Sequence, residues 1–273
     1  MFFNTWHDRR RSLLVKSFSR SSPHFIDTVH GASGDALVMP LSLRGARRHR
    51  YVYEMKAHFT RLVETDISAI TPEFGPSLVE AYKDASQQIE KLEGRNLSAP
   101  QFCRYQGEAG LTSVLAECLS GNTDALSRLH SASSSIDRSV TVIALHGTFS
   151  VANILTDQFS NRARIIYDNG SFIGPVEYDL ATLIETFVDL ANKKRLTGQD
   201  SGAVDRFLSA LVSAFESEFK MDRQVLRDIT LYQYVGHINL FQTLCSHASR
   251  PLVPSATYAK LIATFIRTMD ELI

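Results

Sequence analysis

The sequence predicts an α+β protein with two lobes, and three observations predict this class. Residues 1–92 contain short aromatic and aliphatic runs that are typical of a small antiparallel sheet, together with one expected helix. Residues 98–273 show apolar side chains at helical spacing almost throughout, which predicts a larger, mainly helical lobe. Residues 145–181 interrupt these helices with strand and loop signals. We therefore expect a small lobe at 1–92, a hinge at 93–97 and a helical lobe at 98–273.

The composition excludes several classes of protein. The 273 residues are 44% hydrophobic and 21% charged, which is enough for a substantial core. Lys plus Arg equals Asp plus Glu at 29 each, so no overall field favours nucleic acid or an anionic membrane. The three cysteines are widely spaced without a CxxC pair, which argues against a zinc site and for a reducing compartment. No apolar run reaches the roughly 18 residues of a membrane span. We expect a cytoplasmic protein without nucleic-acid or membrane partners, and the sequence leaves its oligomeric state unknown.

The first elements read as two strands and a helix. An aromatic run at 2–6 and an aliphatic run at 12–18 flank a polar turn, which predicts a hairpin. From residue 47 to residue 64 the apolar side chains recur at helical spacing without Gly or Pro, which predicts the one helix of this lobe.

Proline and glycine at 72–76 separate this helix from two further expected strands, at 77–82 and 87–92. Beyond them the pattern turns helical. The expected helices of the second lobe are 111–118, 123–130, 180–194, 203–220, 223–247 and 255–272.

The stretch from 145 to 181 carries the chemistry. Asn153 follows His146-Gly147 in a loop, and Asp168 comes directly after an apolar run that predicts a buried strand. Asn and Asp side chains supply the oxygen ligands that Mg²⁺ prefers, and nucleotide-bound Mg²⁺ takes only one or two of them from the protein. Both residue types are also common in turns for conformational reasons alone.

The order and spacing of these motifs resemble the aminoglycoside phosphotransferase and choline kinase group of small-molecule kinases, which have the protein-kinase fold. The matching motifs are His146-Gly147, Asn153, Asp168, Gly174-Pro175 and Tyr178-Asp179-Leu180-Ala181. The resemblance covers residues 12–190 and, more loosely, the helices that follow. It implies a bilobal kinase-like fold in which Asn153 and Asp168 bind Mg²⁺ and the small lobe binds ATP or GTP.

The resemblance also assigns the nucleotide contacts. Lys16, inside the second strand, would bind the nucleotide phosphates, although an edge-strand lysine in solvent is the simpler alternative. Glu54, on the expected helix, would pair with Lys16, or it is an exposed helix carboxylate. Glu90 and Leu92 would lie beside the nucleotide at the hinge.

Two further residues of the motif are expected to be structural. His146 would pack beneath the catalytic loop and hydrogen-bond backbone to fix its shape. Asp179 would cap the helix that follows and brace the same loop.

Two features depart from the family pattern. Thr148 stands where the family has the aspartate that accepts the substrate proton, and a threonine hydroxyl is not a base near neutral pH. We expect its side chain at the mouth of the cleft, several ångströms from Asn153, with no carboxylate nearby. Only 15 residues, none of them glycine, precede Lys16, so the first strand and the glycine-rich phosphate loop are expected to be lacking.

The sequence supports two functions. The first is transfer of the γ-phosphate of ATP or GTP to a hydroxyl of a small metabolite or antibiotic-like acceptor, at a low rate because Thr148 replaces the catalytic Asp. The second is an inactive pseudokinase that binds a nucleotide, a ligand or a partner.

Overall fold

The structure is a computed structural model, and it describes residues 3–8, 13–18, 36–39, 50–54, 58–70, 72–93, 117–119, 121–136, 141–157, 159–160, 162–167, 171–248 and 253–273. The chain divides into two compact units: unit 1 is Met1–Ser98 with Ala144–Phe172, and unit 2 is Ala99–Ile143 with Ile173–Ile273. The chain passes between them within β6 (Val142–Leu145) and β9 (Phe172–Pro175), which pair as a two-stranded sheet.

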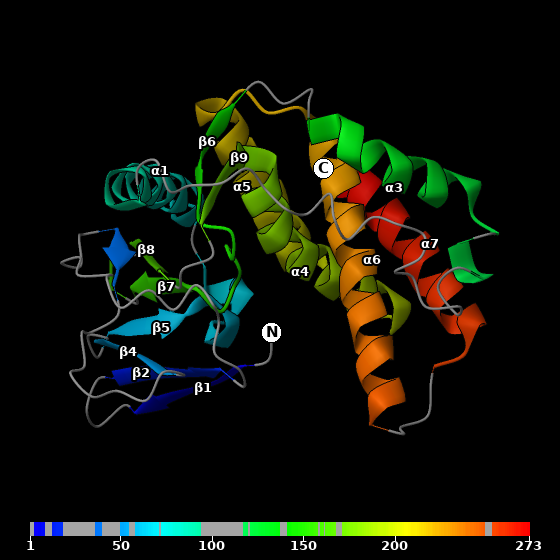
Figure 1. The fold of residues 1–273 in the computed structure, drawn as a ribbon, viewed down its shortest axis with the longest axis horizontal. Coiled ribbons are helices and arrows are strands. Elements are labelled where there is room, and N and C mark those ends of the chain that lie inside the picture. Colours follow the sequence, from blue (N-terminus) through cyan, green and yellow to red (C-terminus); the bar gives the residue numbers. More distant parts are fainter. Residues whose placement is uncertain are drawn as a thin grey trace. The chain divides into compact units, whose positions relative to one another are not determined.

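Unit 1 begins with a three-stranded antiparallel sheet of β1 (Phe3–Asp8), β2 (Leu13–Phe18) and β4 (Arg50–Glu54), in the order β1-β2-β4 (Figure 1). The register pairs Trp6 with Val15 and Val15 with Val52. The predicted hairpin is therefore confirmed.

A second sheet of unit 1 has the order β3-β8-β7-β5, from β3 (Leu37–Val38), β8 (Ala163–Ile166), β7 (Ile154–Asp157) and β5 (Phe59–Arg61). β5, β7 and β8 pair antiparallel, while the short β3 pairs parallel with β8. A core cluster of buried residues joins the two sheets: Val38, Tyr53, Phe59, Leu155 and Ile166.

The helix of unit 1 is α1 (Phe74–Glu93), so the prediction of strands at 77–82 and 87–92 is wrong. Phe74, Leu78, Ala85 and Ile89 fall on one helical face, and each is 0–1% exposed. Full burial of a Phe, Leu or Ile side chain contributes about 1.5–3 kcal/mol. The Ala, Glu, Gln and Lys residues between them are good helix formers, and α1 packs on β3 and β8.

The prediction of a helix at 47–64 is also wrong, because this segment contains β4, β5 and the 3-10 turn Leu62–Glu64. The run Arg50–Glu54 is rich in aromatic and β-branched residues, which fit a pleated surface better than a helix. Tyr53 is fully buried in the core cluster, and that burial decides the local structure.

Unit 2 is helical, and its main helices are α3 (Thr123–Ile136), α4 (Val176–Leu196), α5 (Gly202–Glu218), α6 (Arg223–His247) and α7 (Ser255–Leu272). The bounds of α4 to α7 were predicted within four residues, whereas α3 was predicted only as far as residue 130. α6 packs against α3, α4 and α7. The rings of Tyr234 and Phe265 stack with centroids 3.7 Å apart, which links α6 to α7. The expected helix at 111–118 lies mostly outside the described residues. Within the described parts of the chain, no helix is both long and apolar enough to cross a membrane.

Candidate active site

The loop between β6 and β7, residues 146–153, is held from both ends within unit 1. Ser86 on α1 donates to the carbonyl of Ala144 at 2.7 Å, and Asn153 N–H donates to the carbonyl of Ser150 at 2.9 Å. Gly147 has a φ of 78°, a left-handed conformation that glycine adopts without strain. This turn lets the side chains of His146 and Thr148 meet.

His146 is buried, and its hydrogen bonds define its tautomer. Nε2 lies 2.7 Å from the carbonyl oxygen of Ile166 on β8, so Nε2 carries the proton. Nδ1 then receives the Thr148 N–H at 3.4 Å and lies 3.2 Å from the Thr148 hydroxyl. The rings of Phe149 and Tyr167 pack edge-on against the imidazole, each at 6.4 Å between centroids.

Asn153 is 2% exposed, and its amide orientation is fixed by Thr148. Nδ2 lies 2.7 Å from the Thr148 carbonyl and 3.2 Å from the Thr148 hydroxyl. A carbonyl oxygen can only accept, so the amide nitrogen must face Thr148. The oxygen Oδ1 is therefore the atom of this amide that a cation would contact.

The contact between Thr148 and Asn153 corrects one expectation. The two side chains were expected several ångströms apart, and instead they are hydrogen-bonded at 3.2 Å. The nearest aspartate along the loop, Asp157, accepts from the N–H groups of Phe159 and Ser160 and from the Ser160 hydroxyl. These bonds close the β7–β8 turn, so the Asp157 carboxylate is already used as an acceptor within that turn.

The strand before Asp168 is anchored from two sides. The N–H of Tyr167 donates to the carbonyl of Val38 at 3.0 Å, and the buried Tyr53 hydroxyl donates to the carbonyl of Tyr167 at 2.8 Å. Asp168 itself lies outside the described residues, so its predicted role as a metal ligand remains a prediction.

The predicted phosphate lysine lies on the central strand of the first sheet. Lys16 pairs with Thr5 on β1 and Tyr51 on β4. Glu54 lies on β4 in register with Leu13, on a strand where a helix had been expected. Lys16 and Glu54 are therefore not register partners, and an ion pair between them remains a prediction.

The two predicted hinge contacts lie on a helix. Glu90 and Leu92 belong to the last turns of α1, and both side chains are exposed, Leu92 to 47%. They do not belong to a strand that leads into a hinge, and residues 94–97 of the expected hinge lie outside the described residues. Their contact with a nucleotide remains a prediction.

Asp179 was expected to cap α4, and this expectation is wrong. The helix begins at Val176 with Pro175 as its N-cap, so Asp179 lies inside the first turn, where it is fully buried. A carboxylate in the first turn still interacts favourably with the helix dipole. Glu177, also buried in this turn, accepts the Asp222 N–H at 3.0 Å.

Sequence reasoning missed the groups that hold the loop. The carbonyl of Ile166 on β8 contacts His146, and the hydroxyl of Ser86 on α1 contacts Ala144, and both groups are far from the loop in sequence. No local pattern indicates such contacts. Among the described residues no group of three or more His, Cys, Asp or Glu could hold a metal ion.

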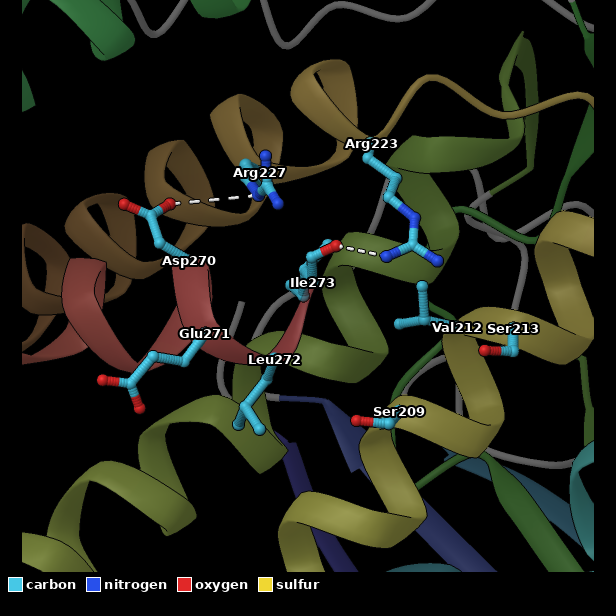
Figure 2. Close-up of a pocket in the computed structure, with 9 residues that line it drawn as sticks. All are labelled: Ser209, Val212, Ser213, Arg223, Arg227, Asp270, Glu271, Leu272 and Ile273. Carbon is cyan, nitrogen blue, oxygen red and sulfur yellow. Dashed lines mark hydrogen bonds and ion pairs between the residues drawn. The ribbon is translucent and has the colours of Figure 1, made fainter.

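Unit 2 contains a separate pocket of about 270 Å³, which holds none of the loop residues (Figure 2). Its lining is Ser209, Val212, Ser213, Arg223, Arg227, Asp270, Glu271, Leu272 and Ile273. Arg223 donates to the carbonyl of Ile273 at 2.9 Å and binds Glu216. Arg227 lies 3.9 Å from Asp270. Both arginines face acceptors of the protein itself, so the pocket is not assigned a ligand.

Neither the known protein-family models nor the curated protein sequences match this chain. Solved structures do match it. A GDP complex of a mutant aminoglycoside 2'-phosphotransferase-IIIa has a TM-score of 0.53 at 13% identity, covering 95% of this chain and 84% of that one. A microcompartment-associated aminopropanol kinase has a TM-score of 0.53 at 16% identity, with coverage of 95% and 84%. A choline/ethanolamine kinase family protein from Mesorhizobium loti has a TM-score of 0.46 at 14% identity, with coverage of 95% and 87%.

The two scores above 0.5 establish the fold. The chain has the α+β, protein-kinase-like fold, with a small sheet-containing unit and a helical unit. Both structures are less than 25% identical to this chain, so the likeness is one of fold, and it is the fold that the motifs between 145 and 181 predicted.

Proposed function

We propose that this protein binds a Mg²⁺–nucleotide at the 146–153 loop and transfers the γ-phosphate of ATP or GTP to a hydroxyl of a small molecule. The acceptor is a metabolite or an antibiotic-like compound. Both structural neighbours above are named as kinases or phosphotransferases of small molecules, and one contains GDP. Fold alone does not define a function, so the proposal depends on the loop.

The observation that carries the proposal is the fixed amide of Asn153. Its nitrogen bonds to Thr148 at 2.7 and 3.2 Å, so Oδ1 is the atom of this side chain that could serve as an oxygen ligand. Mg²⁺ accepts oxygen ligands and needs few of them when phosphates and waters complete its shell. Asn153 therefore fits the metal, and Asp168 would be its second ligand. A bound Mg²⁺ would neutralise charge on the transferred phosphate.

The remaining nucleotide contacts are proposed from the resemblance. Lys16 would bind the phosphates from the central strand of the sheet. Glu54 would support Lys16, and Glu90 and Leu92 would lie near the base.

Thr148 determines how active this site can be. Phosphoryl transfer depends largely on positioning and on metal electrostatics, so a kinase can lose its carboxylate base and keep some activity. We propose weak transfer for this reason. The alternative is a pseudokinase that keeps nucleotide or ligand binding without turnover, and the same Thr148 favours it.

A thermal-shift titration tests the nucleotide site without knowledge of the acceptor. Wild type is measured with ATP and with GTP, each with and without Mg²⁺. At a ligand concentration of 100 Kd, binding stabilises a protein by about 2.7 kcal/mol. Asn153→Ala and Asp168→Ala should lose the Mg²⁺-dependent part of the shift.

Asp157→Ala is the matched control, because it removes a nearby carboxylate that the β7–β8 turn already uses. It should keep the full Mg²⁺–nucleotide shift. A wild type that neither nucleotide stabilises contradicts the proposal, as does an unchanged shift in both Asn153→Ala and Asp168→Ala.

A further inference from the structure

The hydroxyl of Thr148 is oriented by two neighbours in unit 1. Nδ1 of His146 lies 3.2 Å from Thr148 Oγ1, and Nδ2 of Asn153 lies 3.2 Å from the same atom. Because His146 Nε2 donates to the Ile166 carbonyl, Nδ1 of the neutral ring can only accept. Thr148 must therefore donate its proton to His146, while its oxygen receives an N–H of Asn153.

We propose that Thr148 and His146 form a proton relay that replaces the missing carboxylate base. The inference rests on the proposed phosphotransfer. Thr148 is half-buried, whereas His146 is 2% exposed, so an acceptor would reach His146 only through Thr148. Thr148 is thus the catalytic residue, and His146 is the residue that positions it and receives its proton.

The step conserves atoms and charge. The acceptor oxygen forms a bond to the γ-phosphorus of the nucleotide, and the bond from that phosphorus to the nucleoside diphosphate breaks. The proton of the acceptor hydroxyl passes to Thr148 Oγ1, and the Thr148 proton passes to His146 Nδ1. The imidazolium returns a proton to Thr148 as the phosphorylated product leaves, and Thr148 releases its own to solvent.

The surroundings of His146 suit both of its states. In the neutral ring Nε2 donates to the Ile166 carbonyl and Nδ1 accepts from Thr148. In the imidazolium Nδ1 would donate to the Thr148 oxygen, while the bond to Ile166 stays in place. A buried charge is costly unless it is hydrogen-bonded, and here both N–H groups of the cation have an acceptor within 3.2 Å.

The relay predicts a graded series at position 148. Thr148→Val removes the hydroxyl at nearly constant shape, and Thr148→Ser restores it. General-base catalysis contributes typically about 10² to 10⁴-fold. Nucleotide hydrolysis, with water as the acceptor, should therefore fall by about 100-fold or more in Thr148→Val and stay within about tenfold of wild type in Thr148→Ser.

Thr156→Val is the matched control. Thr156 is a buried threonine on β7 whose hydroxyl bonds to the Thr60 carbonyl at 3.2 Å, outside the relay. This variant should hydrolyse nucleotide like wild type. All four proteins should still show a Mg²⁺–nucleotide thermal shift, because each keeps the Thr148 carbonyl that holds the Asn153 amide at 2.7 Å.

A second experiment tests the tautomer of His146 and does not require any nucleotide turnover. Nitrogen-15 NMR of the apo protein should show His146 as the Nε2–H tautomer. Its Nδ1 resonance should move in Thr148→Val and stay in place in Thr156→Val. An Nδ1–H tautomer in wild type overturns the relay.

The outcomes separate the two proposals. Loss of turnover in Thr148→Val alone, with nucleotide binding retained, supports the relay. Equal turnover in Thr148→Val and wild type overturns the relay and leaves the phosphotransferase function standing. Binding without any wild-type turnover overturns the relay and leaves the pseudokinase. A wild type that no Mg²⁺–nucleotide stabilises overturns the proposed function, and the relay with it.

Discussion

Two histidines, one in each unit, show how partners determine what an imidazole does. His146 in unit 1 lies between a backbone carbonyl and a hydroxyl, at 2.7 and 3.2 Å. His237 on α6 of unit 2 lies 3.0 Å from the carboxylate of Glu185 on α4. Glu185 raises the pKa of His237 through this hydrogen bond, against the opposing effect of burial.

The difference lies in the charge of the partner. A carboxylate favours the imidazolium, so His237 is suited to an ion pair between two helices. A carbonyl and a hydroxyl satisfy the neutral ring of His146, with one hydrogen bond donated and one accepted.

The largest effect should come from giving His146 a carboxylate neighbour. Thr148→Asp places an acidic base in the position of the hydroxyl and next to His146 Nδ1. If the nucleotide site is intact, phosphotransfer or nucleotide hydrolysis should rise, and the gain could approach the roughly 10² to 10⁴-fold of general-base catalysis. Steady-state turnover of both proteins checks this. Vigorous wild-type turnover that Thr148→Asp leaves unchanged or damages would contradict the weak transfer proposed for this site.

The next effect is on stability, where the two histidines should differ. His146→Phe keeps the ring packing but removes the donor to the buried Ile166 carbonyl, which should cost about 1–3 kcal/mol of the free energy of unfolding. His237→Phe changes a side chain that is 59% exposed, so it should cost less than about 1 kcal/mol. Urea titrations of both variants measure these two free energies of unfolding. Equal losses of stability would contradict the difference expected between the two histidines.

Two buried tyrosines test the same point, which is how a hydrogen-bond partner changes the contribution of a polar group to stability. Tyr53→Phe removes the bond to the Tyr167 carbonyl and should cost about 1 kcal/mol. Tyr258 on α7 is the matched control, since its hydroxyl is buried and has no hydrogen-bond partner in the described part of the protein. Tyr258→Phe should therefore be neutral or slightly stabilising in the same titration. A larger loss in Tyr258→Phe than in Tyr53→Phe would contradict this reading.

The smallest effect is the pH dependence of the His237–Glu185 pair. Because the folded-state pKa of His237 is raised, the pair's contribution is complete below the unfolded-state value of about 6.5 and is lost as the pH rises through the folded value. Because the His237 side chain is 59% exposed, although that of Glu185 is only 10% exposed, the contribution should be about 0.2–1 kcal/mol. Glu185→Gln should flatten this part of the stability–pH curve, and an unchanged curve would mean that other groups produce it.

The predictability of the fold differed between the two units. The helices of unit 2 carry amphipathic patterns long enough to define them, and α6 and α7 were predicted at their observed bounds. In unit 1, the segments 47–64 and 77–92 were assigned the wrong elements. Short apolar runs fit a strand or a helix almost equally well, and packing around Tyr53 and Leu78 made the choice.

The sequence predicted which residues belong to the candidate site, but not the hydrogen bonds between them. His146, Thr148 and Asn153 were recognised from their spacing. Their hydrogen bonds depend on the left-handed turn at Gly147 and on the Ile166 carbonyl, twenty residues away. The direct contact between Thr148 and Asn153 was missed for this reason. It changes the expected role of Thr148 from a lost base to an oriented hydroxyl.

The most direct test of the account is whether Asn153 contacts the metal of a bound nucleotide. Mn²⁺ can replace Mg²⁺, and its unpaired electrons broaden NMR signals of nearby nuclei. With the protein saturated by Mn²⁺–ATP or Mn²⁺–GTP, the side-chain amide signals of Asn153 should disappear, and they should remain sharp with the Mg²⁺ complex. A sharp Asn153 amide in the Mn²⁺-saturated protein would place the metal elsewhere and contradict the proposed site.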